Sequence, residues 1–431
     1  MAARVLTARE ADGLVPRVTP LRPSRTAWSR LACAVLVLSA LTLLAAEGAA
    51  ADKKRARELG LVPLIGGTPG ALDAITDVAG VEVGQTTLIS GEGRLVVGKG
   101  PVRTGVTVFH PRGRTSGDAV FGAWFTLNGN GEMTGTTWLQ ESGFLEGPIA
   151  ITNTHSVGIV RDAILQWQAS RPGLQPWGLP VVAETWDGVL NDINGFHVKA
   201  EHAIAALDGA RGGPVAEGNV GGGTGMVCHG FKGGIGTASR KLSAADGGYT
   251  VGVLVQCNYG LRRDFRVGGV PVGEEIPDQL PCLSLPDAPL TDGMKRCADV
   301  GPSRDADQGS IIVVVATDAP LLPHQLKRIA TRPSLGIGRM GGRGNNSSGD
   351  IFVAFSTANP GTAGSKENVR VEAIPNDRIS PLFAATIQAT EEAILNALLA
   401  AETMTGIDGA RVTALPVDRL LAALRKYNRL P

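Results

Sequence analysis

Aromatic residues are scarce in this sequence, and charge of neither sign is in excess. Phe, Trp and Tyr make up 4% of the 431 residues, and 41 Lys and Arg stand against 40 Asp and Glu. Surfaces that bind nucleic acid usually combine basic patches with aromatic rings on which bases stack. The composition therefore argues against nucleic acid as a partner. Because 43% of the residues are hydrophobic, there is ample apolar surface for a packed core, and a disordered chain is excluded.

Signatures of metal and nucleotide cofactors are also missing. The sequence contains no CxxC and no HExxH, and its six His residues are scattered, so we expect no zinc site. The glycines of 336–341 fit the GxGxxG spacing, but the residues that follow lead into a strand, whereas a dinucleotide site requires a helix there. The glycine cluster 221–225 lacks the Lys of a phosphate-binding loop, and it predicts a close approach of backbone to backbone or substrate.

The first 51 residues have the pattern of an export signal. Six Arg residues precede an apolar run over 31–46, and small residues at 48–51 then lead into a charged segment. A basic region, a short apolar stretch and a small-residue end are typical of a secretory signal, and the run is short for a membrane span. We predict that residues 1–51 are removed on export and that the protein is periplasmic or secreted. Retention of this segment as a membrane anchor is the alternative.

Short apolar runs separated by glycine turns dominate the rest of the chain. Apolar residues at helical spacing predict helices over 156–169, with Ile159 and Trp167 on the buried side, and over 382–403, with Pro381 in a first turn. Helices and strands mix irregularly, so the pattern predicts sheets covered by helices in a layered α/β sandwich. The strands are expected at 106–111, 119–129, 148–153, 249–258, 310–318 and 350–357.

Four cysteines lie beyond the predicted signal. Cys228 and Cys257 have apolar, strand-like neighbours, and we predict that each is a buried free thiol. Cys282 and Cys297 are separated by 15 positions in a segment rich in Pro and Asp, where a disulfide would close a loop in an oxidising compartment. The spacing alone leaves this second pairing open, because a disulfide depends on geometry that the sequence does not show.

A polar segment, 273–309, separates two apolar parts of the chain. It is rich in Pro, Asp and Gly and lacks periodicity, so we predict an exposed connection. The connection ends at Gly309-Ser310, and the next residues, IIVVVA, predict a fully buried strand. A polar connection that runs through Gly-Ser into a buried strand is a plausible processing site, although such pairs are usually turns.

Three polar clusters adjoin the predicted strands. Residues 154–158 are similar to a nucleophile elbow but lack its leading glycine, so Ser156 is expected to cap the helix that follows. Residues 183–188 form an acidic turn after an apolar run, and residues 345–350 can be explained by the hydrogen bonding of Asn and Ser in turns. Each cluster on its own is better explained by a structural role than by a catalytic one.

Together, these segments resemble the DmpA-type family of serine hydrolases, the self-processing L-aminopeptidase/D-esterases and β-peptidyl aminopeptidases. The resemblance covers nearly all of the chain beyond residue 51. It implies a layered αββα sandwich of the DmpA/ornithine acetyltransferase type. The matching segments are ITDVAGVEVGQTTL (75–88), GVTVFHPRG (105–113), NGNGEMTG (128–135), ITNTHSVGIVRDA (151–163), GGGTGM (221–226), LVQCNYG (254–260), GSIIV (309–313), ATDAPLLPHQL (316–326) and NSSGDIFVAFSTAN (346–359).

The resemblance also implies a self-cleavage. The chain would cut itself between Gly309 and Ser310, which gives an α chain, 52–309, and a β chain, 310–431, of one hydrolase domain. Ser310 would then be both the first residue of the β chain and the nucleophile.

The other site residues are carried over from the family position by position. Ser348 and Asp350 match the serine and the acidic residue that assist the nucleophile, and Asn258 matches the oxyanion-hole asparagine. Glu184 matches the carboxylate that meets the free amino group of the substrate. Trp186 stands where the family carries a tyrosine that helps to hold the oxyanion or the substrate.

We therefore expect an exported, self-processing serine aminopeptidase that acts on peptides, amides or esters with a free N-terminal amine, α- or β-aminoacyl. The family suggests a homo-oligomer of αβ units, and neither a metal nor an organic cofactor is expected. Two alternatives stay open. One is a self-processing acyltransferase of the ornithine acetyltransferase type, whose nucleophile is a threonine, and the other is a catalytically silent periplasmic binding protein with the same fold.

Overall fold

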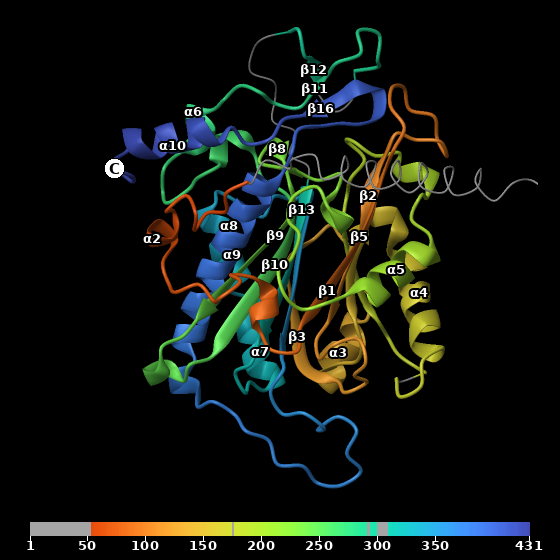
Figure 1. Ribbon diagram of the computed structural model, residues 1–431, viewed down its shortest axis with the longest axis vertical. Coiled ribbons are helices and arrows are strands. Elements are labelled where there is room, and N and C mark those ends of the chain that lie inside the picture. The colour runs from red at the N-terminus through yellow and green to blue at the C-terminus, as the bar shows by residue number, and fades with distance from the viewer. Residues whose placement is uncertain (1–52, 175, 291–293, 300–308) are drawn as a thin grey trace, which may run out of the picture. The chain divides into compact units, whose positions relative to one another are not determined.

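Two sheets stacked face to face form the centre of the molecule (Figure 1). The computed structural model describes residues 53–174, 176–290, 294–299 and 309–431, so the predicted signal, 1–51, lies outside the described residues. The first sheet has the strand order β1 (Glu82–Ser90), β2 (Val102–His110), β5 (Ile149–Asn153) and β6 (Val181–Thr185). The second has the order β4 (Phe144–Leu145), β3 (Val120–Gly129), β14 (Ser348–Ser356), β13 (Gly309–Thr317), β10 (Thr250–Asn258) and β9 (Gly234–Lys241).

Strand β13 lies inside the second sheet and is covered on both faces. Successive side chains of a strand point to opposite faces. Ile312 and Val314 accordingly join the core between the two sheets, whereas Ile311 and Val313 join the core on the other face. A strand covered on both faces needs no polar alternation, so the fully buried strand that the sequence predicts here is confirmed.

Helices cover the outer face of each sheet. α4 (Val157–Ala169) and α5 (Ala200–Gly209) share a hydrophobic core with the first sheet. α7 (Pro323–Ala330) and α9 (Ser380–Ala400) pack on the second sheet, and α8 (Pro333–Arg339) packs against α9. Figure 1 shows the two groups of helices on opposite sides of the stacked sheets. The predicted αββα layered sandwich is therefore confirmed.

Both predicted helices are present, with one error in a buried side. α9 has Pro381 in its first turn, as predicted. In α4, Trp167 is buried, but Ile159 is 38% exposed and Val160 is buried instead. Val160 lies four residues before the buried Ile164, whereas Ile159 is rotated from that side by about 100° at 3.6 residues per turn. Ser156 occupies the N-cap position, but its hydroxyl makes no capping hydrogen bond.

The connection at 273–309 is less irregular than predicted. Its described part contributes β11 (Cys282–Leu283) and β12 (Lys295–Arg296) to a small third sheet with β15 (Met404–Thr405) and β16 (Ala410–Val412). Pairs of residues are too short to leave a periodic pattern in the sequence. The remaining short elements are α2 (Val62–Ile65), α3 (Thr136–Ser142), α6 (Val272–Glu275), α10 (Val417–Lys426), β7 (Val227–Cys228) and β8 (Phe231–Lys232).

The four cysteines form two disulfides. Cys282 pairs with Cys297 at a Cα–Cα distance of 5.0 Å, so the disulfide that the sequence left undecided is present. Cys228 pairs with Cys257 at a Cα–Cα distance of 5.7 Å, so the prediction of two free thiols is wrong. The short strand β7 turns back beside the end of β10, where the Val227 N–H donates to the Asn258 side chain. This contact between segments far apart in the chain brings the two sulfurs together.

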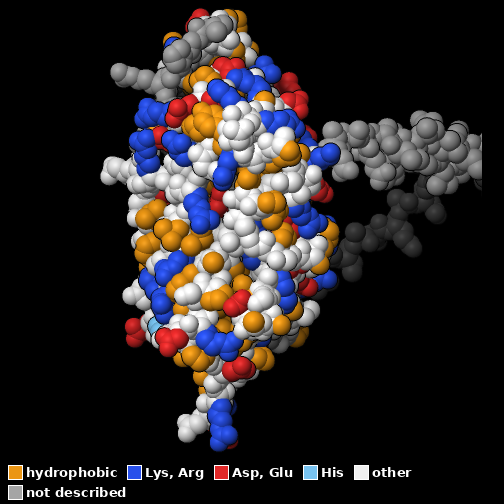
Figure 2. Space-filling model, turned by 90° about the vertical axis from the view of Figure 1, so that its left-hand side faces the viewer, with side chains coloured by type: hydrophobic (Ala, Val, Ile, Leu, Met, Phe, Trp, Pro, Cys, Tyr) orange, Lys and Arg blue, Asp and Glu red, His pale blue; other side chains and the backbone are white. Residues whose placement is uncertain are grey.

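The surface carries both charge signs in mixture. On the face shown in Figure 2, the Lys and Arg side chains of the described residues are scattered among acidic and hydrophobic ones. This distribution agrees with the near-zero formal charge of the sequence. Among the described residues, no helix combines the length and the apolarity needed to cross a membrane.

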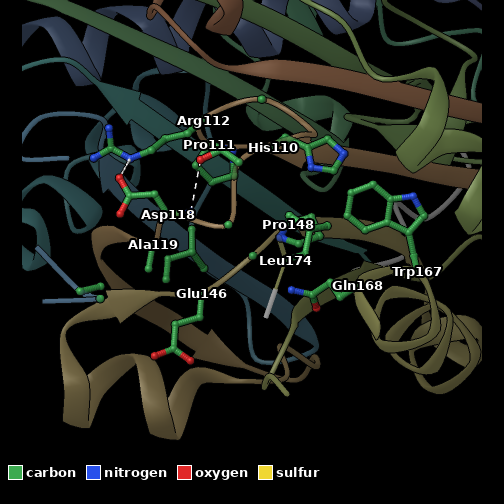
Figure 3. Close-up of a pocket in the computed structure, with 17 residues that line it drawn as sticks. His110, Pro111, Arg112, Asp118, Ala119, Glu146, Pro148, Trp167, Gln168 and Leu174 are labelled. Atoms are coloured by element: carbon green, nitrogen blue, oxygen red, sulfur yellow. Dashed lines mark hydrogen bonds and ion pairs between the residues drawn. The ribbon is translucent and has the colours of Figure 1, made fainter. Parts of the chain in front are cut away.

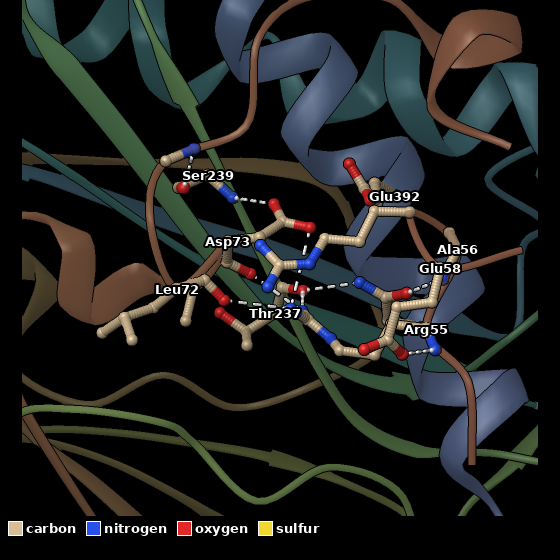
Figure 4. Close-up of polar contacts among 12 residues, drawn as sticks. Arg55, Ala56, Glu58, Leu72, Asp73, Thr237, Ser239 and Glu392 are labelled. Carbon is tan, nitrogen blue, oxygen red and sulfur yellow. Dashed lines mark hydrogen bonds and ion pairs between the residues drawn. The ribbon is translucent and has the colours of Figure 1, made fainter. Parts of the chain in front are cut away.

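A buried cluster of charges ties the start of the described chain to α9 (Figure 4). Arg240 is fully buried, and its guanidinium lies 2.6 Å from a carboxylate oxygen of Glu392 on α9 and 3.7 Å from one of Asp73. Arg55 pairs with Glu217 at 2.7 Å, and next to it the Ala56 N–H donates to the Asn396 side chain of α9 at 2.9 Å. The cluster therefore joins residues on both sides of the Gly309–Ser310 bond.

Replacing Arg240 by Met removes the cation at the centre of this cluster. Two carboxylates, Asp73 and Glu392, then remain buried beside each other without that partner, and breaking a buried ion pair from one side typically costs about 3–5 kcal/mol. We expect the free energy of unfolding, measured with urea, to fall by about that amount. Lys426→Met is the control, because Lys426 pairs with Glu275 at the exposed surface and its loss should leave the midpoint unchanged. Equal midpoints for Arg240→Met and the parent would contradict a stabilising role.

Candidate active site

Ser310 lies at one end of the second sheet, where three strands meet. β13 runs parallel to β14 and antiparallel to β10, so the start of β13 lies between the start of β14 and the end of β10. In this register Ser310 is opposite Gly349 on one side and Asn258 on the other. The Gly349 N–H donates to Ser310 Oγ at 3.1 Å, and Ser310 is 5% exposed. The hydroxyl is therefore held by this hydrogen bond at the start of an interior strand.

Ser348 and Asp350 form a hydrogen-bonded pair beside this serine. Ser348 Oγ donates to Asp350 Oδ1 at 2.6 Å, and the Asp350 N–H donates to Asn128 Oδ1 at 2.8 Å. Burial raises the pKa of Asp350, and the hydrogen bond from Ser348 opposes that rise. The other oxygen, Oδ2, is buried and has no hydrogen-bond partner among the described residues. The pair therefore offers an acceptor oxygen within the group of strand ends that holds Ser310.

Asn258, the last residue of β10, is held at both ends of its amide. Its Oδ1 accepts the Val227 N–H at 2.7 Å, and its Nδ2 donates to the Trp186 carbonyl at 2.9 Å. A backbone N–H must face the oxygen of the amide, so these contacts fix which end is the donor. Nδ2 carries two hydrogens, and one remains for another acceptor beside Ser310.

Glu184 comes from the first sheet, near the end of β6. Its carboxylate accepts the Glu132 N–H at 2.9 Å and the Thr154 hydroxyl, and the residue is 3% exposed. Burial raises the pKa of Glu184, and these two hydrogen bonds oppose the rise. A buried carboxylate that already accepts two donors can pair with one further cation.

Residues from both sheets line one cavity of about 560 Å³ at this end of the sandwich. Ser310 and Glu184 both line it, although they are 126 positions apart and belong to different sheets. Trp186 also lines it, with its ring above Gly188, where an added Cβ would lie 2.4 Å from the ring. Asn258, Ser348 and Asp350 lie on the two strands that flank Ser310 and do not line this cavity. The structure therefore gathers all the predicted site residues at one end of the sandwich.

A second, smaller cavity lies at the other end of the first sheet (Figure 3). Its volume is about 140 Å³, and Pro148, Trp167 and Gln168 are among its lining residues. Pro148 precedes β5, whereas Thr154, which lines the larger cavity, follows it, so a strand of five residues, about 17 Å, separates the two. The smaller cavity is thus separate from Ser310. In the described part of the chain, no cluster of three or more His, Cys, Asp or Glu residues is placed to hold a metal ion.

Gly309 has a backbone conformation that favours glycine. Its φ is +148°, and an added Cβ would lie 2.0 Å from the Asn258 carbonyl oxygen. Contacts of this kind under 3.0 Å are essentially absent from proteins. The bond between Gly309 and Ser310 can therefore follow this path only with a glycine on its N-terminal side.

Some contributors to the site were not predicted as functional residues. Asn128 and Gly349 position Asp350 and Ser310, and Thr154 and Glu132 position Glu184. All four fall in segments that resemble the family, so the resemblance indicated the segments but not these individual residues. Their contributions are backbone N–H groups and single hydroxyl or amide contacts across the sheets, which residue type alone does not reveal.

Residues 73–412 of this chain match the protein family described as "Peptidase family S58". The protein "Beta-peptidyl aminopeptidase BapA" of Sphingosinicella microcystinivorans is 57% identical over 389 residues, which cover 90% of this chain and 96% of the relative. The protein of the same name from Sphingosinicella xenopeptidilytica is 49% identical over 400 residues, which cover 91% of this chain and 96% of the relative.

Solved structures with the same architecture include a Burkholderia sp. beta-aminopeptidase. It has a TM-score of 0.76 and 49% sequence identity, and the match covers 88% of this chain and 100% of that one. The L-aminopeptidase D-Ala-esterase/amidase of Ochrobactrum anthropi, described as a variant of the Ntn hydrolase fold, has a TM-score of 0.75 and 43% identity, covering 88% of this chain and 99% of that one. At these identities the likeness extends beyond the fold to the sequence.

Proposed function

This chain belongs to peptidase family S58 and is an aminopeptidase, a hydrolase with an N-terminal nucleophile, and on that premise we propose that Ser310 becomes this nucleophile when the chain cuts itself after Gly309. The substrates are short peptides, amides or esters with a free N-terminal amine, and the names of the Sphingosinicella relatives favour β-aminoacyl groups among them. The observation that carries the proposal is that Ser310 and the buried carboxylate of Glu184 face one cavity.

Self-cleavage begins with attack of Ser310 Oγ on the carbonyl carbon of Gly309. The C–N bond between the two residues breaks as a C–O ester bond forms, and the nitrogen of Ser310 takes up the proton of the hydroxyl. Water then hydrolyses the ester, which leaves the carboxylate of Gly309 and the free hydroxyl and amine of Ser310. The conformation of Gly309 supports this step, because a residue without a side chain leaves the carbonyl open to attack.

Gly309→Ala tests the geometry of this bond. The Cβ of Ala would meet the Asn258 carbonyl, so the chain must shift at the position that self-cleavage requires. We expect the first-order rate of self-cleavage, followed by denaturing electrophoresis, to fall at least about 100-fold, since misplacing reacting atoms by about 1 Å can cost this much. Gly158→Ala is the control, because an added Cβ there meets nothing within 4 Å. A normal rate for Gly309→Ala would remove the geometric argument.

After cleavage, the amine of Ser310 serves as the general base. A serine hydroxyl is a weak nucleophile until a base takes its proton. An unperturbed α-amine has a pKa of about 7.7–8.0, so a useful fraction of such a group is neutral near pH 7–8. The Ser348–Asp350 pair, with its unpartnered buried oxygen, is suited to orient that amine. The acyl group is transferred to Oγ, the leaving amine takes the proton, and water completes the hydrolysis.

Glu184 selects substrates with a free amine. Its buried carboxylate would pair with the substrate ammonium, an interaction that an N-acetylated substrate cannot make. The substrate is then held by its N-terminus, which makes the enzyme an aminopeptidase rather than an endopeptidase. A panel of β-alanyl, L-alanyl and D-alanyl p-nitroanilides with their N-acetyl counterparts tests this. Hydrolysis of the N-acetyl compounds at comparable rates would refute the assignment.

Replacing Glu184 by Gln keeps the shape of the side chain and removes its charge. We expect KM for free-amine substrates to rise about 30-fold or more, because losing one member of a buried charge pair costs at least about 2 kcal/mol. The measurement is steady-state kinetics of the processed enzyme. Glu141→Gln, at an exposed position of α3, is the matched control and should leave KM unchanged. An unchanged KM for Glu184→Gln would remove this residue from the substrate site.

Export and assembly complete the proposal. The arginine-rich start and the apolar run at 31–46 support removal of residues 1–51 on export to the periplasm or the medium. The two disulfides of the described chain support an oxidising compartment. The cleaved α and β chains would stay together as one hydrolase domain, and αβ units would assemble into a homo-oligomer. N-terminal sequencing of the exported protein and its mass in solution test both statements.

A further inference from the structure

Lys232 is a fully buried lysine close to the site. It lies on β8 and is 0% exposed. In the described part of the chain, its ammonium donates only to backbone carbonyls, those of Met226 and Gly233 at 2.9 Å and that of Gly223 at 3.4 Å. Burial lowers the pKa of Lys232 to about 7. The three carbonyl acceptors match the three hydrogens of an ammonium and so favour the charged form. A buried cation without a carboxylate partner is costly, so its presence calls for an explanation.

A continuous path of hydrogen bonds runs from Lys232 to Asn258. The ammonium donates to the Met226 carbonyl, and the same peptide unit carries the Val227 N–H. That N–H donates to Asn258 Oδ1 at 2.7 Å, and Nδ2 of the same amide is the donor beside Ser310. The path therefore consists of two amide groups, the Met226–Val227 peptide and the Asn258 side chain. In each, the carbonyl oxygen accepts a hydrogen bond from the Lys232 side and the N–H donates away from Lys232.

We propose that Lys232 is a positioning residue for the reaction, which acts through the Met226–Val227 peptide to hold Asn258 and to strengthen its Nδ2–H as a donor to the oxyanion. This inference rests on the role of oxyanion-hole donor that the family resemblance implies for Asn258. A cation at the carbonyl end of an amide makes its N–H a stronger donor, and hydrogen bonds in such a chain reinforce one another. The effect grows when negative charge develops on the substrate oxygen, so it belongs to the transition state more than to substrate binding.

A purely structural role is the competing explanation. The three carbonyl contacts also tie together the tight glycine-rich turns at 221–233, and a lysine that only did this would affect folding and not the chemical step. The two explanations differ in one respect. If Lys232 acts through Asn258, its contribution disappears when Asn258 is replaced, whereas a structural contribution remains.

The test is a double-mutant cycle in the full-length chain. Lys232→Met, Asn258→Ala and the double variant are compared with the parent for the rate of self-cleavage and, after processing, for kcat and KM on β-alanyl p-nitroanilide. We expect Lys232→Met to lower kcat and the cleavage rate about tenfold with KM unchanged, which is the lower end of the effects seen when residues that orient metal ligands are replaced. The double variant should be no slower than Asn258→Ala. Lys232→Arg, which keeps a positive donor, should recover part of the loss.

Three results would overturn the inference: a normal kcat for Lys232→Met, a change confined to KM, or losses that multiply in the double variant. If Asn258→Ala itself has normal kcat, the proposed role of Asn258 fails first, so the two failures are distinguishable. If Lys232→Met does not accumulate as folded protein, Lys232→Gln replaces it in the cycle. Its amide can still donate to the carbonyls but carries no positive charge, and the same expectations apply to it.

Discussion

Ser310→Ala is expected to yield a full-length chain with no aminopeptidase activity. In the proposed mechanism, self-cleavage needs the hydroxyl to attack the Gly309 carbonyl, and without cleavage the α-amine proposed as the base is never formed. One substitution therefore removes both the nucleophile and the base. Denaturing electrophoresis should give a single band in place of fragments that correspond to 52–309 and 310–431. Hydrolysis of aminoacyl p-nitroanilides should fall to the rate without enzyme.

The fold should survive this change. Ser310 Oγ accepts one hydrogen bond, from the Gly349 N–H, and loss of that acceptor costs about 1–3 kcal/mol of stability. A loss of this size lowers the unfolding midpoint without abolishing the fold, so Ser310→Ala should still unfold in a single cooperative transition. Ser310→Cys is the matched control, because a thiol restores a nucleophile of similar size and should restore some cleavage. Ser310→Ala material that still splits, or that still turns over substrate, would refute the assignment.

The layered architecture could be predicted because the central strand that follows Ser310 is buried on both faces. The run after Ser310 is apolar without alternation, and the structure covers it with a second sheet on one face and helices on the other. The same logic predicted α9, whose buried stripe is broad. Strand order could not be predicted, because the pairing of β13 with β14 and β10 joins segments about 40 and 50 residues away through contacts that the sequence does not encode locally.

The site residues were predicted through resemblance and not through local pattern. Ser310, Asn258 and Glu184 each stand at or near a strand end, but three strands from two sheets must meet before the residues become a site. Taken singly, each fits a turn or a cap equally well. The cysteines illustrate the same limit: Cys228 and Cys257 have the apolar neighbours of free thiols, and only the return of β7 to β10 brings them together.

Asn258→Ala is the second large effect that we expect, a fall in kcat of about 100- to 1,000-fold with little change in KM. Removing one oxyanion-hole donor typically has this cost, because the hydrogen bond strengthens as negative charge develops on the reacting oxygen. We expect the rate of self-cleavage to fall with kcat, because the same donor would stabilise the tetrahedral intermediate formed at Gly309. Denaturing electrophoresis of precursor samples quenched at successive times measures the rate of self-cleavage. Steady-state kinetics of the processed fraction measure kcat.

Alanine at this position also deprives the Val227 N–H of its acceptor, so a matched variant must separate that loss from the loss of the donor. Asn258→Asp does so, because an aspartate keeps an oxygen toward Val227 and replaces Nδ2–H by a second oxygen. A negative charge beside a developing oxyanion is unfavourable, so Asn258→Asp should be at least as slow as Asn258→Ala although it preserves the Val227 contact. If Asn258→Asp instead has nearly normal kcat, the side chain acts by holding Val227 in place, because a carboxylate cannot donate to the Trp186 carbonyl. The donor to the oxyanion must then be sought elsewhere around Ser310.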